Sequence, residues 1–285
     1  MSRDESEPTE GHLTRGKTAR NRLRRIDLYL ALMERELLSR EDAAYRDALY
    51  VDLGYGRMPY TTLESAERLR RVNPGLRVLG VEIDPERVQE ARPFTDANTM
   101  FREGGFNLPL VEKGGKRESA RLIRAMNVLR QYDEGDVRDA YRLLGINLLP
   151  GGLLVEGTSN PSGRVWVVNL LRRQELPELH LEAILFGTNF KDGFDPAMFQ
   201  SVLPKCFIHR VVPGEWMYAF FETWKAAWLE TMGLRVYGPR QWFVAAAGKL
   251  QEGGYPIDIH PKLLSRGMLR VGSNAEFAPI ALNLL

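Results

Sequence analysis

The sequence predicts an α/β fold in which a mostly parallel β-sheet lies between layers of helices. Residues 49–53 form an apolar run typical of a strand buried on both faces, and glycines follow it at positions 54 and 56. A second apolar strand, at 77–83, carries Glu82 at its end. A third, at 153–157, follows a predicted helix that ends in Pro-Gly-Gly. Strands that alternate with helices in this way form parallel sheets.

Composition indicates the class of protein but not its function. The 285 residues suffice for one large domain with extensions, and 44% hydrophobic and 27% charged residues are ordinary for a globular protein. The formal charge of +2 does not indicate a nucleic-acid partner for the whole chain. The single cysteine, Cys206, excludes an internal disulfide and a cysteine-rich zinc site. No apolar run resembles a membrane span or a signal peptide, so we expect a cytoplasmic protein without a membrane partner.

The chain begins with a polar segment and a basic cluster. Residues 1–19 are polar and contain proline and glycine, which predicts a flexible tail. The basic cluster at 20–25 leads into apolar residues at the spacing of an amphipathic helix, ending near Leu37. The cluster is either a solvated helix start, a patch for an anionic substrate such as RNA, or an arm that closes over a site.

The first strand and its loop suit a bound nucleoside. The glycines after Asp52 let the backbone turn tightly under a ligand. A helix should begin near Pro59, with Thr61 and Glu64 forming a capping box. Glu82, at the end of the next strand, is placed to accept hydrogen bonds from both hydroxyls of a ribose.

These motifs resemble those of class I S-adenosylmethionine-dependent methyltransferases, whose first strand ends in an acidic residue followed by Gly-x-Gly. A dinucleotide site would need a third glycine to receive the pyrophosphate at a helix N-terminus, and Pro59 stands there instead. The resemblance implies a three-layer Rossmann-like fold with a seven-stranded, mostly parallel sheet and S-adenosylmethionine as cofactor. It further implies that four residues cradle the methionine part of the cofactor, namely Asp52, Gly54, Tyr55 and Gly56, that Glu82 binds the ribose, and that Ile83 flanks the adenine.

Three downstream elements extend the resemblance to about residue 157. Gly105 stands where the family commonly has a carboxylate that contacts the adenine amino group, so backbone groups near Phe106 must supply that contact. Asn127 follows the fourth strand of the family and is either a site residue or a helix cap. The helix expected at 135–148 and the Pro-Gly-Gly at 150–152 match the family before its fifth strand.

The resemblance weakens further along the chain. Residues 165–171 predict a strand or a helix, and 181–187 a strand. An aromatic stripe at 216–228 has helical spacing, which favours core, with a dimer face or a lid as the alternative. Residues 242–248 predict a closing strand. We therefore expect a methyltransferase domain at 20–250 that begins with a helical element, and an extension of unknown role at 251–285.

The expected chemistry is methyl transfer by in-line displacement, which depends mainly on holding the reactants in line. A general base is optional, and the candidates are Glu156, His180 and His209. The sequence identifies no catalytic residue, no metal site and no particular acceptor, and a homo-oligomer is compatible with it. Two alternatives stay open: a dinucleotide-dependent oxidoreductase, and a non-catalytic module of the same fold that binds RNA through Arg20 to Arg25.

Overall fold

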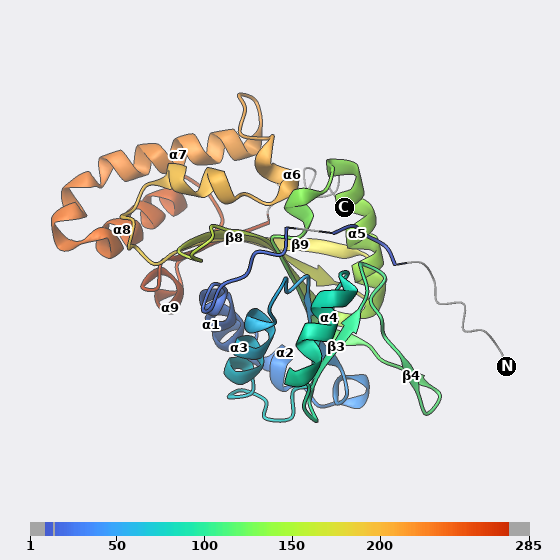
Figure 1. The fold of residues 1–285 in the computed structure, drawn as a ribbon. Coiled ribbons are helices and arrows are strands. Elements are labelled where there is room, and N and C mark those ends of the chain that lie inside the picture. The colour runs from blue at the N-terminus through green and yellow to red at the C-terminus, as the bar shows by residue number, and fades with distance from the viewer. Residues whose placement is uncertain (1–8, 14, 274–285) are drawn as a thin grey trace.

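A computed structural model describes residues 9–13 and 15–273 of the chain, and Figure 1 shows an α/β fold around one large sheet. This sheet has nine strands in the order β10-β11-β9-β8-β7-β6-β1-β2-β3. Their bounds are β1 Leu49–Leu53, β2 Val78–Glu82, β3 Thr99–Glu103, β6 Ala120–Met126, β7 Leu148–Ser159, β8 Val165–Arg173, β9 Leu179–Thr188, β10 Ile257–Asp258 and β11 Met268–Gly272. A separate hairpin pairs β4 (Glu112–Lys113) with β5 (Lys116–Arg117).

The helices alternate with the strands in the first half of the chain and gather near its end. The α-helices are α1 Arg24–Met33, α2 Arg35–Ser39, α3 Tyr60–Leu69, α4 Pro85–Ala91, α5 Glu134–Asn147, α6 Lys205–Ile208, α7 Trp216–Glu230, α8 Pro239–Glu252 and α9 Pro261–Leu264. The 3-10 turns are η1 Ala43–Tyr45, η2 Arg92–Phe94, η3 Leu129–Gln131, η4 Pro196–Val202 and η5 Met232–Tyr237.

The sheet is largely parallel, as predicted, but has nine strands rather than seven. Strands β3, β2, β1, β6 and β7 pair in parallel, and of the described strands in this sheet only β8 and β11 run against the others. Residues 165–171 lie in a strand, β8. The two additional strands, β10 and β11, come from the segment after residue 250; β11 pairs with β9, and β10 forms the edge of the sheet.

Helices cover both faces of the sheet, so the fold has three layers (Figure 1). Helices α1, α2, α3 and α9 share one buried cluster with strand residues such as Tyr50 and Leu122. Helices α5, α6, α7 and α8 share the other with Val51 and Ile123. Neighbouring residues of one strand thus face opposite layers, as the two-residue period of a strand requires.

The aromatic stripe is mainly core. Phe220, Phe221 and Trp224 of α7 are buried against Phe186 of β9. Helix α8 packs beside α7 in Figure 1, where the sequence predicted a closing strand. That prediction is wrong because the buried residues of α8 follow a helical period over its whole length: Trp242, Phe243, Ala246, Ala247 and Leu250.

The start of α3 also differs from the prediction. Pro59 precedes the helix as its N-cap residue, and the cap makes no side-chain hydrogen bond. Thr61 Oγ1 donates to Asp52 instead, and Glu64 accepts from the backbone of Asn21. The capping box is therefore wrong, because both of its side chains have tertiary partners.

The described residues contain neither a membrane-spanning helix nor a cluster of metal-ligating side chains. No helix among them combines the length and apolarity needed to cross a bilayer. No group of three or more His, Cys, Asp and Glu side chains there is arranged to hold a metal ion.

Candidate functional site

The glycine loop lies at the carboxyl end of β1, next to the end of β2. Gly54 and Gly56 have φ values of 71° and 83°, a region that residues with a side chain rarely adopt. Space is also limiting, because a Cβ on Gly54 would lie 2.6 Å from Val128 Cγ2 and one on Gly56 would lie 2.7 Å from the carbonyl oxygen of Gly16. The loop is therefore glycine-dependent for two separate reasons.

Glu82 joins the ends of β1 and β2. Its carboxylate is buried and accepts hydrogen bonds from the backbone N–H of Gly56 at 2.8 Å and of Ile83 at 3.1 Å. Arg87 of α4 lies 3.4 Å from the same carboxylate. Glu82 thus fixes the glycine loop and has a guanidinium beside it.

Asp52 belongs to a buried charge network that joins β1 and β6 to α1 and α3. Its carboxylate accepts from Thr61 and Thr62 of α3 and lies 2.9 Å from Nη2 of Arg124 on β6. Arg124 also pairs with Asp27 of α1 at 2.7 Å. Burial alone would lower the pKa of Arg124, but the two carboxylates raise it. The Asp52 carboxylate is therefore occupied by protein partners, although the residue lines the cavity described next.

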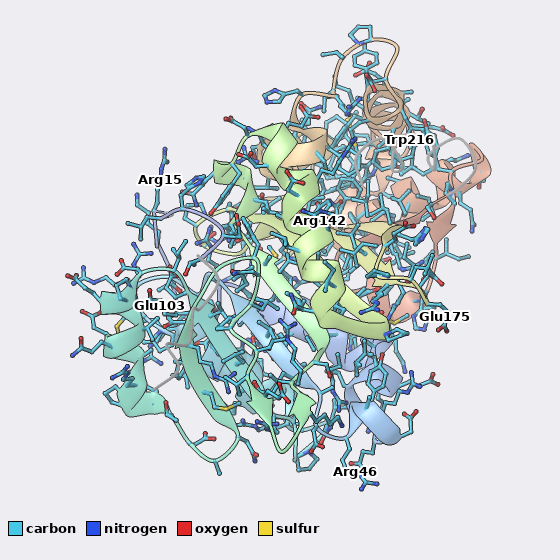
Figure 2. The ribbon with its side chains drawn as sticks, turned by 90° about the vertical axis from the view of Figure 1, so that its right-hand side faces the viewer. Arg15, Arg46, Glu103, Arg142, Glu175 and Trp216 are labelled. Carbon is cyan, nitrogen blue, oxygen red and sulfur yellow. The ribbon has the colours of Figure 1, made fainter. Side chains whose placement is uncertain are left out.

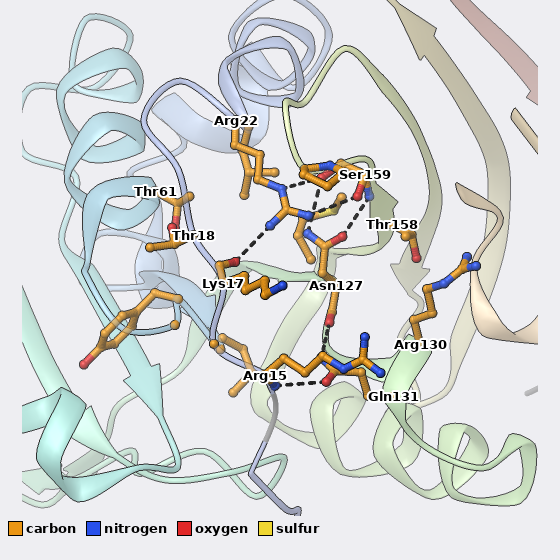
Figure 3. Close-up of a pocket in the computed structure, with 18 of the residues that line it drawn as sticks. Arg15, Lys17, Thr18, Arg22, Thr61, Asn127, Arg130, Gln131, Thr158 and Ser159 are labelled. Atoms are coloured by element: carbon orange, nitrogen blue, oxygen red, sulfur yellow. Dashed lines mark hydrogen bonds between the residues drawn. The ribbon is translucent and has the colours of Figure 1, made fainter. Parts of the chain in front are cut away.

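A cavity of about 720 Å³ opens beside the glycine loop, over the ends of β1, β6 and β7 (Figure 3). Asn127, at the end of β6, has a φ of 62°, and its amide oxygen accepts from the backbone N–H of Ser159 at 2.9 Å. Asn127 is therefore a cavity residue that ties β6 to β7, rather than the cap of η3, whose N-cap residue is Val128.

Residues 9–13 and 15–18, here called the strap, cross the carboxyl ends of the strands. The hydroxyl of Tyr132 accepts from the N–H of His12 at 2.7 Å and donates to its carbonyl at 2.9 Å. Arg15 N–H donates to Gln131, and Gly16 accepts from Arg57 N–H. The sequence predicted a flexible tail here. Residues 1–8 and 14 of that tail lie outside the described part of the chain, whereas the strap makes specific contacts.

The strap fills the space next to Glu82. A residual cavity of only about 20 Å³ is lined by Glu10, His12, Glu82, Ile83, Gly105 and Phe106 among others. The N–H of Phe106 donates to the carbonyl oxygen of Glu10 at 2.9 Å. A Cβ on Gly105 would lie 1.8 Å from that oxygen, so only glycine permits this path of the strap. The structure thus places Ile83, Gly105 and Phe106 around one small cavity, with residues of the strap among them.

Tyr55 lies apart from this group. Its ring is buried at an edge-on angle to Phe101 of β3, with centroids 5.4 Å apart, and its hydroxyl donates to the carbonyl of Arg87 at 3.4 Å. Its backbone follows Gly54 in the loop, and the residue lines the larger cavity.

The candidate general bases lie away from both cavities. His180 and His209 are exposed, and neither lines a cavity. Glu156 of β7 is buried, and its carboxylate accepts hydrogen bonds from Tyr141 of α5 at 2.8 Å and from Asn169 of β8 at 3.1 Å. Of the four histidines, only His12 lines these cavities, and its ring centroid lies 3.8 Å from that of Tyr132 with the two rings tilted by 32°. Sequence reasoning missed it because no local pattern marks its position.

Glu156 predicts a pH dependence of stability. Burial raises its pKa to about 7 from an ordinary 4.5. Between these values the unfolded chain loses the proton and the folded chain keeps it, so the stabilising contribution is complete below pH 4.5 and is lost as pH rises through 7. We expect the free energy of unfolding of the parent to fall by on the order of 2 kcal/mol between pH 5 and pH 8 through this group, and we expect Glu156→Gln to abolish that fall. Urea unfolding at both pH values measures it, with the exposed Glu175→Gln as control (Figure 2). An equal pH dependence in all three proteins would contradict the prediction.

The basic cluster at 20–25 does not form one surface. Arg20 lies over the ring of Tyr60 at 4.5 Å, and Arg22 donates to Ser159 and Asn160 at the end of β7. Arg25 faces the other way: burial, and then the charges of Arg240, Arg24 and Arg266, lower its pKa to about 10. The arginines therefore point to three different places.

No protein-family model matches the sequence, and no curated protein matches it. Several solved structures are similar to part of it. An S-adenosylmethionine-dependent methyltransferase from Mesorhizobium loti is 21% identical, with 45% of this chain and 53% of that chain covered and a TM-score of 0.31. The magnesium protoporphyrin IX methyltransferase of Synechocystis, with bound S-adenosylhomocysteine, is 15% identical, with coverages of 48% and 54% and a TM-score of 0.35. Human N-acetylserotonin methyltransferase, in complex with S-adenosylmethionine, is 20% identical, with coverages of 50% and 39% and a TM-score of 0.31.

The chain spans less than two thirds of the length of each of these structures. Its own strand order and helix layers define a Rossmann-like α/β fold. Similarity at this level does not decide the activity, which has to be argued from the residues of the site.

Proposed function

We propose that the protein binds S-adenosylmethionine at the carboxyl ends of β1 and β2 and transfers its methyl group to an acceptor in the adjoining cavity. The observation that carries this proposal is the position of Glu82. Its buried carboxylate lies between the glycine loop and Ile83, at the point where ligands bind in open α/β sheets. Leu53, Gly54 and His12 line both cavities, so one elongated ligand can extend from Glu82 into the larger space.

The chemistry requires mainly alignment of the acceptor, the methyl group and the sulfur. In this proposal Gly54 and Gly56 hold the methionine part through their backbone, Asp52 and Tyr55 support that loop, and Glu82 accepts hydrogen bonds from the ribose. Asn127 fixes the floor of the cavity.

A dinucleotide-dependent oxidoreductase is supported less well. Such a site receives its pyrophosphate at a helix N-terminus directly after the glycines. Here α3 begins at Tyr60, and residues 57–59 separate it from Gly56. We therefore expect no change in nicotinamide fluorescence when NADH is titrated with the protein.

Calorimetric titration with S-adenosylhomocysteine tests the proposal, and we expect one site per chain. Residues 9–13 of the strap occupy part of the space near Phe106, so cofactor binding should displace them. Tyr132→Phe removes the hydroxyl that makes two hydrogen bonds to His12 and keeps the ring. Because the two bonds contribute about 1 kcal/mol each, we expect this variant to bind S-adenosylhomocysteine up to about 30-fold more tightly.

Hydrogen exchange supplies the second measurement. Amides of residues 9–13 should exchange faster in Tyr132→Phe, and faster in the parent when S-adenosylhomocysteine is bound. Tyr45→Phe is the matched control, because it removes a hydroxyl that donates a hydrogen bond to the carbonyl of Pro150, away from the strap. Absence of binding would overturn the proposed function, whereas binding with weaker affinity in Tyr132→Phe would show that the strap belongs to the bound state.

A further inference from the structure

The larger cavity is lined by positive charge. Arg15, Lys17, Arg22 and Arg130 contribute to its wall, and Figure 3 shows them around Asn127 and Ser159. The carboxylate residue in this lining is Asp52, whose charge is paired with Arg124. The wall therefore carries a net positive charge without a free carboxylate to balance it.

Arg22 and Arg130 differ in what they contact. Arg22 donates to Lys17, Ser159 and Asn160, so neutral oxygens of the protein occupy its guanidinium. Arg130 makes one hydrogen bond, from Nη1 to the carbonyl of Leu203 at 2.9 Å. None of the ion pairs between described residues includes Arg130, and burial lowers its pKa. A partly buried charge without a counter-ion is costly, which is typical of a binding group.

Thr158 lies on the same side of the cavity as Arg130 (Figure 3). The residue is 4% exposed, and its Oγ1 atom is buried without a hydrogen-bond partner among the described residues. An unsatisfied buried hydroxyl in a cavity wall can donate to a ligand. A guanidinium and a hydroxyl on one wall together suit the oxygens of a carboxylate or a phosphate.

The cofactor itself does not balance this charge. S-adenosylmethionine carries a sulfonium and an ammonium against one carboxylate, so its binding adds one positive charge beside the cavity. The charge of the wall and that of the cofactor then favour the same kind of partner.

We infer that the methyl acceptor is an anion, and that Arg130 and Thr158 bind its carboxylate or phosphate group while Arg15 and Lys17 of the strap face it. This inference rests on the proposed function and names the class of substrate for that site. The two ends of the strap then have different roles: residues 9–13 lie near Glu82 and are displaced when the cofactor binds, whereas Arg15 and Lys17 line the acceptor cavity.

The test uses the full chain saturated with S-adenosylhomocysteine and two probes at constant ionic strength, inorganic pyrophosphate for the phosphate class and citrate for the carboxylate class. We expect calorimetry to detect binding of at least one probe. The affinity for that probe should fall about tenfold in Arg130→Gln and about threefold in Lys17→Gln. Arg46→Gln, at an exposed arginine far from Arg15 in Figure 2, should leave it unchanged. The probe that binds identifies the anionic group.

Other outcomes separate the two proposals. If S-adenosylhomocysteine binds but neither anion does, or if an anion binds equally to the parent and to Arg130→Gln, the anionic acceptor is overturned and the cofactor site stands. If S-adenosylhomocysteine does not bind while pyrophosphate binding depends on Arg130, the cavity is an anion site but the proposed function is wrong. Binding of S-adenosylhomocysteine by Arg130→Gln also shows that the variant is folded.

Discussion

Replacing Arg124 by alanine is expected to lower the free energy of unfolding by about 3 to 5 kcal/mol. The guanidinium is fully buried and pairs with Asp27 and Asp52, both of which are also buried. Its removal leaves Asp52 without a cation next to it and leaves Asp27 with Arg68 alone, at 2.8 Å, in an interior that solvates carboxylates poorly. Helices α1 and α3 meet at this network, because Ser65 donates to Asp27 and Thr62 donates to Asp52. Urea unfolding monitored by circular dichroism measures the effect.

Arg142→Ala is the matched control for this prediction. Arg142 lies on α5 with its side chain 66% exposed, and its nearest carboxylate, Asp139, is 3.9 Å away. Exposed pairs of this kind contribute little, so the control should change stability by less than about 0.5 kcal/mol. If the free energy of unfolding fell by the same small amount in both variants, the Arg124 network would not stabilise the fold.

Glu82→Ala is expected to weaken binding of S-adenosylhomocysteine by about 30- to 150-fold, which corresponds to about 2 to 3 kcal/mol. Two effects combine. The carboxylate that accepts from the ribose is lost, and the N–H of Gly56 loses the acceptor that fixes the glycine loop. Calorimetric titration measures the affinity, and thermal unfolding checks that the variant is folded.

Glu103→Ala is the control for this substitution. Glu103 is the register partner of Glu82 on β3, but its side chain is exposed. It therefore carries the same charge at the same edge of the sheet without touching the glycine loop. Unchanged affinity in Glu82→Ala, or an equal loss in Glu103→Ala, would remove Glu82 from the site.

The sequence predicted the parallel half of the fold because its signals are local. Apolar runs, glycines and a Pro-Gly-Gly break mark β1, β2 and β7 within a few residues each, and the structure has strands at all three. The prediction for 242–248 failed because the window was too short to contain the helical period that continues to Leu250.

The site was only partly predictable, because several of its partners are distant in the chain. Asp52 follows the motif expected of a ligand-binding residue, but Arg124 and Asp27 come from β6 and α1. The strap is polar and has no secondary structure, so nothing in its composition indicates the hydrogen bonds between His12 and Tyr132, 120 residues away. Gly105 departs from the family pattern because Glu10 approaches it closely, and this contact joins residues that are distant in the chain.

The aromatic cluster on α7 and α8 has a consequence for spectroscopy. Four of the five tryptophans, Trp216, Trp224, Trp228 and Trp242, lie on these two helices, and none of the four lines either cavity. Their emission therefore reports on the packing around β9, while far-ultraviolet dichroism reports on the whole chain. Unfolding curves that coincide by both signals would indicate that the antiparallel edge and the ligand-binding edge of the sheet melt as one cooperative unit.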